Sequence, residues 1–305
     1  MMSSILSPLL NNAKVKVDRV ICVENLIKDY KKHLNIDVSS YFIGLQEITL
    51  YKCELSGYRF FYPYNVAGNG FFYEQLQSYD WYYMPWKWEN QKTLSLLNKT
   101  YKILEIGSGG LGFIKKLNDL GYNITGLELN ENSVKIGQSI GVNIKNESIQ
   151  NHAKTNLGYY DFVCSFQVLE HISEVNSFIE AQISCLKKGG KLLISVPNNN
   201  SFIKFNHGGI LNAPPHHMGL WDINSLKYLT NIYNIKLDSV FYEPLQDYHL
   251  DWFINSSIAF RFKRMPLLRR FFGSYKFKIL FRRIVKVFQK FIKGHTIIAV
   301  FVKEK

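Results

Sequence analysis

From residue 102 onward, short apolar runs alternate with segments whose apolar residues recur every three or four positions. The runs predict buried strands, at residues 102–106, 124–128, 142–146, 160–166 and 191–196. The segments between them predict helices, and Asn130 is placed to cap the one that runs to about Ile140. Two last strands are expected at 235–242 and 296–303. This alternation predicts a parallel sheet with helices on both faces, which binds ligands at the carboxyl ends of its strands.

The N-terminal part of the chain has a less regular pattern. We expect a helix at residues 23–33 and a hairpin at 50–63 that turns at Gly57. A helical stretch interrupted at Pro85 is expected at 71–98. The segment 79–89 is dense in aromatic residues and fits a lid over a ligand as well as a packed helix. We therefore divide the chain into an N-terminal extension, 1–98, and a second domain, 99–305.

About fifty residues, 244–293, separate the last two predicted strands. Placed on a helix at about 100° per residue, residues 275–293 sort into an apolar half and a basic half. The apolar half holds Phe277, Leu280, Phe281, Ile284, Val285, Val287, Phe288, Phe291 and Ile292. Such a helix suits an anionic membrane surface, reached through 266–293. The alternative is an apolar face packed on the protein and a basic face in water.

Charge is concentrated in the same insert. The formal net charge of the 305 residues is +13, and residues 252–303 hold thirteen of the 37 lysines and arginines without one acidic residue. The remaining basic residues balance the 24 acidic ones, so nucleic acid is an unlikely partner for the chain as a whole. An RNA-binding or RNA-modifying protein that uses the basic insert stays an alternative.

Four scattered cysteines form no disulfide framework, which fits a reducing compartment. Neither a signal peptide nor a membrane-spanning run is expected from the sequence. These features predict a cytoplasmic protein, and the amphipathic helix adds a peripheral position on the inner face of the membrane as an expectation.

A glycine-rich segment follows the strand predicted at 102–106. Gly107, Gly109 and Gly112 permit a tight turn and a close backbone approach to a ligand at the start of a helix. The spacing alone fits a nicotinamide dinucleotide as well as S-adenosylmethionine, so an NAD-dependent oxidoreductase is an alternative. Glu105 inside the strand suits a ligand with an ammonium group, and Glu128 after the next strand suits ribose hydroxyls.

Two downstream segments, Gln167 to Ile172 (QVLEHI) and Leu186 to Ile194 (LKKGGKLLI), complete a resemblance to the class I S-adenosylmethionine-dependent methyltransferases. The resemblance implies a Rossmann-like α/β fold with a seven-stranded, mostly parallel sheet and S-adenosylmethionine as cofactor. It assigns the methionine end of the cofactor to Glu105, Gly107, Ser108, Gly109 and Gly112, and the ribose to Glu128. It assigns the adenine to Leu129, Ser148 and Ile149, and the methyl region to Gln167. Many relatives have Asp at the position of Ser148, where this sequence departs from the pattern.

The acceptor side is less specified. His171, His216 and His217 are the candidates for a general base, because imidazole takes up protons near neutral pH. The family resemblance and the amphipathic helix together favour O-methylation of a small or carrier-linked acceptor, such as a saccharide or glycan intermediate. Cys53 and Ser56 resemble half of a zinc ribbon that has lost ligands, and with Cys22 alone in the other half we expect no metal.

Overall fold

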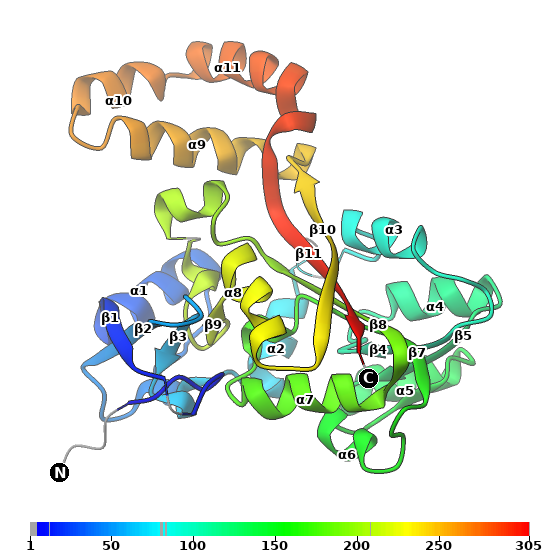
Figure 1. The fold of residues 1–305 in the computed structure, drawn as a ribbon. Helices are drawn as coiled ribbons and strands as arrows, with labels where there is room; N and C mark the ends of the chain where they lie inside the picture. Colours follow the sequence, from blue (N-terminus) through cyan, green and yellow to red (C-terminus); the bar gives the residue numbers. More distant parts are fainter. Residues whose placement is uncertain (1–4, 12, 80–81, 83, 208, 305) are drawn as a thin grey trace.

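A computed structural model describes residues 5–11, 13–79, 82, 84–207 and 209–304 (Figure 1). Its larger sheet has the strand order β10-β11-β8-β7-β4-β5-β6. These strands are β4 (Lys102–Ile106), β5 (Asn123–Leu127), β6 (Ile144–Lys145), β7 (Tyr160–Phe166), β8 (Leu186–Pro197), β10 (Ile235–Pro244) and β11 (Lys293–Lys303). The pairs among β4 to β8 are parallel, whereas β11 runs antiparallel to both neighbours. The predicted seven-stranded, mostly parallel sheet is confirmed.

Alternation along the strands builds a core on each face of this sheet. In β4, Leu104 packs in the cluster that includes α7 (Val175–Cys185), whereas its neighbour Ile103 packs with α4 (Gly112–Asp119) and α5 (Glu131–Ser139). Successive side chains of a strand point to opposite faces, so one apolar strand supplies both cores. Helices therefore cover both faces, as expected.

A smaller antiparallel sheet, in the order β1-β2-β3-β9, holds the N-terminal extension. Its elements are β1 (Val15–Cys22), β2 (Glu47–Cys53), β3 (Arg59–Tyr62) and β9 (Gly219–Leu220), with the helices α1 (Val23–Leu34), α2 (Gly70–Gln77) and α3 (Trp88–Leu94). The predicted hairpin is confirmed as β2 and β3. β9 comes from the chain after β8, so the second domain completes the extension's sheet. Cys22 pairs with Glu47 at one end of the β1–β2 ladder and Cys53 with Val15 at the other, which separates the two cysteines.

Several predicted boundaries were wrong. The pattern after the glycine loop predicts a helix from residue 109, but α4 begins at Gly112. The stretch expected to be helical over 71–98 is interrupted around Pro85 as predicted, between α2 and α3, but its second helix ends at Leu94. The sequence predicts a helix over 175–186 that ends at Lys187–Gly190, but these four residues belong to β8. They form a bulge between Leu186, which pairs with Tyr160, and Lys191, which pairs with Phe162. A helix is also predicted over 224–233, and the structure has the shorter α8 (Ile223–Tyr228) there.

The insert forms three helices, α9 (Leu250–Arg261), α10 (Pro266–Phe272) and α11 (Tyr275–Phe288), which project from the sheet beyond β10 and β11 (Figure 1). Lys293, expected in the helix, begins β11. Val285 of α11 is buried among α9 and Phe202, whereas Leu280 and Phe288 keep more than half of their surface exposed. The apolar half of α11 is thus split between the protein and water. No helix within the described ranges is both long and apolar enough to cross a membrane.

Candidate cofactor and acceptor site

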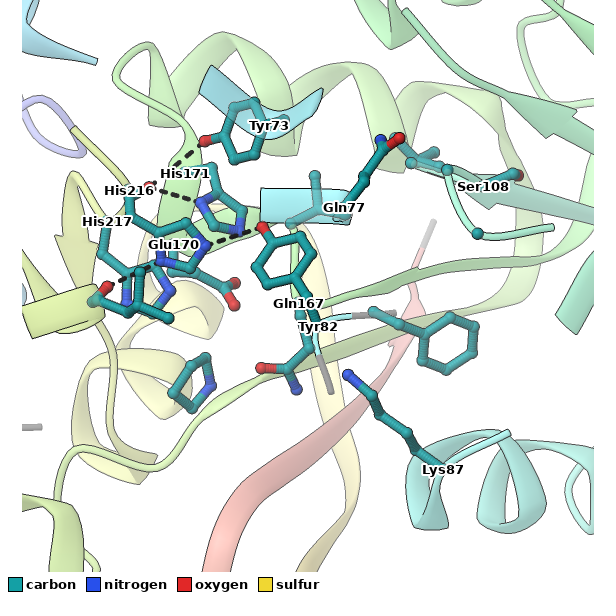
Figure 2. A pocket seen from close by; sticks show the side chains of 18 of the residues that line it. Tyr73, Gln77, Tyr82, Lys87, Ser108, Gln167, Glu170, His171, His216 and His217 are labelled. Carbon is teal, nitrogen blue, oxygen red and sulfur yellow. Dashed lines mark hydrogen bonds between the residues drawn. The ribbon is translucent and has the colours of Figure 1, made fainter. Parts of the chain in front are cut away.

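A cavity of about 1140 Å³ opens at the carboxyl ends of β4, β5, β7 and β8. Every residue predicted to bind the cofactor or to act in catalysis lines it: Glu105, Gly107, Ser108, Gly109, Gly112, Glu128, Leu129, Ser148, Ile149, Gln167, His171, His216 and His217. The glycine loop and the two predicted carboxylates lie at one end, and the histidines lie at the other. Figure 2 shows the histidine end, with Ser108 of the glycine loop across the cavity.

The glycine loop is held by backbone bonds to β5. The amides of Gly107 and Ser108 both donate to Leu127 O, at 2.9 and 3.1 Å. Gly107 has φ +76°, and a Cβ there would meet Val168 Cγ2 at 2.5 Å, so a side chain is excluded by both conformation and space. This loop therefore has the tight turn that a nucleotide-type ligand needs at the start of α4.

Gly112 has a different reason to be glycine. A Cβ at Gly112 would lie 2.0 Å from the carbonyl oxygen of Pro85, in the segment before α3. We expect Gly112→Ala to push this segment away and to cost about 1–3 kcal/mol of unfolding free energy. Chemical denaturation would measure the loss, with Gly121→Ala as a glycine control. That glycine has open space around it, so its cost comes from its φ of +74° and not from a clash. Equal costs would contradict the packing role of Gly112.

Glu105 is a buried carboxylate beside this loop, and only 5% of its surface is exposed. Ser108 Oγ donates to its Oε2 at 3.1 Å. Burial, with a smaller contribution from the negative charge of Glu128, raises the pKa of Glu105 to about 8. Because no cation of the described chain pairs with it, this carboxylate is suited to the ammonium group of a ligand.

Glu128 follows β5 and is half-buried. Its Oε1 accepts hydrogen bonds from the amides of Leu129 and Asn130, both at 2.8 Å, and the amide of Gly109 in the glycine loop also faces the carboxylate. Burial raises its pKa, while the amides lower it. Ser148 instead caps α6 (Ile149–Ala153), with Oγ accepting from Asn151 N at 3.3 Å. Ser148, which stands where many relatives have Asp, therefore uses its hydroxyl to cap a helix.

Gln167 holds a strained backbone at the end of β7. Its φ is +53°, which is uncommon for a residue with a side chain. The main-chain N–H of Gln167 donates to Ser195 O at 2.9 Å, which holds the backbone in this conformation. In Figure 2 its side chain reaches into the cavity between Tyr82 and Lys87.

The three histidines form a cluster. Their ring centroids lie 4.4 to 5.0 Å apart. Each Nδ1 faces an oxygen atom: His216 O for His171, Leu211 O for His216 and Asn212 Oδ1 for His217. Burial lowers the pKa of all three, that of His171 to about 4. The imidazoles are therefore neutral near pH 7, with the proton on Nδ1 and the lone pair on Nε2.

Residues that the sequence did not single out complete this end of the cavity. Glu89 and Glu170 are almost fully buried, and burial raises the pKa of both, that of Glu170 to about 8. His249 and Trp252, from the insert, form part of the wall. Lys87 is the only lysine or arginine among the described residues that line the cavity. The "LEH" segment containing Glu170 was the one signal that could have identified it.

The aromatic segment 79–89, for which a lid and a packed helix were equally expected, contributes Tyr82, Met84 and Pro85 to the cavity wall. Tyr82 Oη lies 2.9 Å from Nε2 of His216. Asp80, Trp81 and Tyr83 of this segment lie outside the described residues. The described part of the segment thus lies against the histidine cluster.

Comparison with known proteins gives a consistent result. A family model described as a methyltransferase domain matches residues 82–240, a little over half of the chain. The ubiquinone biosynthesis O-methyltransferase of Hydrogenovibrio crunogenus is 34% identical over 112 residues, which are 35% of this chain and 46% of that protein. Its counterpart in Pectobacterium carotovorum is 27% identical over 118 residues, 37% of this chain and 48% of that one. The chain thus spans about half the length of the curated relatives it matches.

Solved structures resemble the chain at lower identity. A SAM-dependent methyltransferase from Archaeoglobus fulgidus is 15% identical, with a TM-score of 0.48, and the match covers 71% of this chain and 91% of that one. A putative methyltransferase from Bacillus halodurans is also 15% identical, with a TM-score of 0.49 over 71% of this chain and 99% of that one.

Proposed function

The chain belongs to the class I S-adenosylmethionine-dependent methyltransferases, and on this premise we propose that it methylates a hydroxyl oxygen of an acceptor bound at the histidine end of the cavity. The observation that carries the proposal is the single cavity that joins Glu105 and Glu128 to His171, His216 and His217. Donor and acceptor sites in one cavity are what an in-line transfer requires, since alignment supplies most of the rate.

The chain's residues fit the cofactor. Glu105 lacks a cationic partner and would hold the ammonium group, and Oε2 of Glu128 would hold the ribose. Leu129, Ser148 and Ile149 would lie along the adenine, and Gln167 beside the methyl region. When bound, S-adenosylmethionine supplies an electrophilic methyl group on a sulfonium sulfur.

The histidine cluster would receive the acceptor hydroxyl. Methylation forms a C–O bond, breaks the C–S bond of the donor and releases the hydroxyl proton. Nε2 of His171 is a hydrogen-bond acceptor, because its Nδ1 is directed at His216 O at 2.6 Å. A neutral imidazole in this tautomer can take the proton as a general base. The relatives' name, O-methyltransferase, agrees with an oxygen acceptor.

The charge of the cavity limits the acceptor. Glu89 and Glu170 are buried at the acceptor end, and Lys87 is the only described cation in the wall. An acceptor with a carboxylate or phosphate beside the reacting hydroxyl would meet two acidic side chains and a single lysine, Lys87, whose charge already acts on both of them. Trp252 and Tyr248 offer aromatic faces with polar edges, which suit the faces of a sugar ring. We therefore favour a neutral saccharide, free or carrier-linked.

A methyl-transfer assay tests this function. Donor labelled in the methyl group is incubated with a neutral saccharide on a polyprenyl carrier, the same saccharide free, and the corresponding uronic acid. Label is expected in an ether bond of the neutral saccharides, with much less in the uronic acid. Label found only in amines, in RNA or in the acid would overturn the proposal.

His171→Ala is expected to lower kcat by about 10²–10⁴-fold with unchanged affinity for S-adenosylhomocysteine, and the exposed His33→Ala serves as its control.

We propose that the insert brings the enzyme to an anionic membrane. Leu280, Phe288 and Phe291 of the projecting helices are 55%, 56% and 85% exposed, beside lysines and arginines. Replacing Lys276 and Lys290 by glutamine is expected to weaken binding to phosphatidylserine vesicles by about 30-fold, at about 1 kcal/mol per charge. Sedimentation with vesicles measures this, and Lys31→Gln with Lys32→Gln is a charge-matched control on α1. Equal losses in the two variants, or no loss, would contradict a specific membrane face.

A further inference from the structure

We propose that His171, His216 and His217 form a binding site for a divalent transition-metal ion, with zinc as the ion that suits three imidazoles and one open position. The three side chains come from two places in the chain, the turn after β7 and the loop before β9. One nitrogen of each lies within 4.8 Å of the others. This proposal replaces the expectation from the sequence that the chain binds no metal.

The orientation of each ring supports the site. Metal-binding histidines commonly donate their second N–H to a fixed oxygen, which directs the remaining lone pair at the ion. His171 Nδ1 lies 2.6 Å from His216 O, and His216 Nδ1 lies 2.8 Å from Leu211 O. Both oxygens are main-chain carbonyls and can only accept. Nε2 of each ring therefore carries the lone pair, and at His216 it faces Tyr82 Oη at 2.9 Å.

Asn212 fixes the third ring in the same way. Its Nδ2 donates to Asn199 Oδ1 at 2.8 Å and to His207 O at 2.9 Å, so its oxygen is the atom that faces His217 Nδ1, at 3.0 Å. The two buried imidazoles and the half-buried His171 are thus set in one tautomer by three separate acceptors. A purely structural cluster does not need the same tautomer in all three rings, whereas three ligands that converge on one ion do.

The surroundings favour a cation. Both carboxylate oxygens of Glu170 and Oε2 of Glu89 are buried without a hydrogen-bond partner in the described structure. The described cavity wall offers Lys87 alone as a positive charge. Buried oxygen atoms without a partner are costly, and a bound cation beside them would lower that cost. Tyr82 Oη, 2.9 Å from Nε2 of His216, closes the site on the side of the predicted lid.

The chemistry of the ligands selects the ion. Neutral imidazole suits zinc, cobalt, nickel and copper, whereas magnesium and calcium prefer oxygen ligands. Zinc–nitrogen bonds of about 2.0–2.1 Å place tetrahedral ligands about 3.4 Å apart, so the rings need only a small contraction. An ion held there would replace an imidazole as the group that activates the acceptor hydroxyl. This proposal and methyl transfer can therefore fail separately.

Metal content tests the site without an acceptor. Protein purified without an affinity tag or chelator is dialysed against zinc and analysed by elemental mass spectrometry, and cobalt replaces zinc for visible absorption. We expect one equivalent of zinc and the ligand-field bands of tetrahedral cobalt in wild type. Both should be lost in His217→Ala and kept in His249→Ala, which alters a cavity histidine outside the cluster. Zinc below a tenth of an equivalent in wild type, or equal zinc in His217→Ala, overturns the proposal.

Two measurements guard against misfolding. Affinity for S-adenosylhomocysteine is measured in every variant, because its site lies at the far end of the cavity. Asn212→Leu keeps all three ligands but removes the acceptor for His217 Nδ1, together with the two hydrogen bonds that Asn212 Nδ2 donates to Asn199 Oδ1 and His207 O. It is expected to weaken zinc binding by about 10–100-fold. Unchanged zinc affinity in folded Asn212→Leu would overturn the assignment of His217 as a ligand.

Discussion

S-adenosylhomocysteine is expected to bind Glu128→Ala about 100-fold more weakly than wild type. A carboxylate that accepts hydrogen bonds from neutral hydroxyls contributes about 1.5–3 kcal/mol, and 2.7 kcal/mol corresponds to 100-fold in affinity. Oε2 of Glu128 is the atom available for this contact, since the amides of Leu129 and Asn130 already occupy Oε1. Isothermal titration calorimetry measures the affinity directly.

Two further variants separate binding from stability. Glu128→Gln keeps an oxygen for the two amides ahead of α5 and loses only the charge, so we expect a loss of about tenfold. Glu131→Ala removes an exposed carboxylate three residues away, and its affinity should match that of wild type. Unchanged affinity in Glu128→Ala would remove Glu128 from the cofactor site and would leave the ribose without an assigned partner.

The sequence predicted which residues of the glycine loop line the cavity, because the signals for them are local. Glu105, Gly107 and Gly109 lie within five residues at the end of one strand, and the strand pattern itself places them at the carboxyl edge of the sheet. Asn130 as the cap of α5 is equally local, and its Oδ1 accepts from Ser133 N at 3.0 Å.

The acceptor end could not be predicted in the same detail, because it depends on long-range packing. Glu89, Glu170 and His249 reach one cavity from three distant parts of the chain, and no spacing in the sequence relates them. Gly112 was assigned to the cofactor from its motif, yet the structure gives it the carbonyl of Pro85 as a close neighbour. β9 has only two residues, too few for a periodic pattern.

Proton release on cofactor binding is the effect expected from Glu105. Burial holds the pKa of this carboxyl at about 8, so it is mostly protonated at pH 7 in the free enzyme. A bound ammonium group favours the ionised form, so binding must release the proton below pH 8. Affinity for S-adenosylhomocysteine should therefore rise by up to about tenfold per pH unit between pH 6 and 7.5. Calorimetry in two buffers of different ionisation enthalpy counts the proton directly.

Glu105→Gln isolates this carboxyl. The amide keeps an oxygen for Ser108 Oγ but cannot ionise, so we expect about 100-fold weaker binding of S-adenosylhomocysteine at pH 7.5 and a flat pH profile. The substitution weakens ligand binding but should stabilise the ligand-free protein. When the pKa of a carboxyl is higher in the folded than in the unfolded protein, the folded protein loses stability as pH rises from about 4.5 to 8. The ligand-free variant should thus unfold at a higher temperature than wild type at pH 8. A variant that is less stable at pH 8, or that still releases a proton on binding, would show that Glu105 is ionised in the free enzyme.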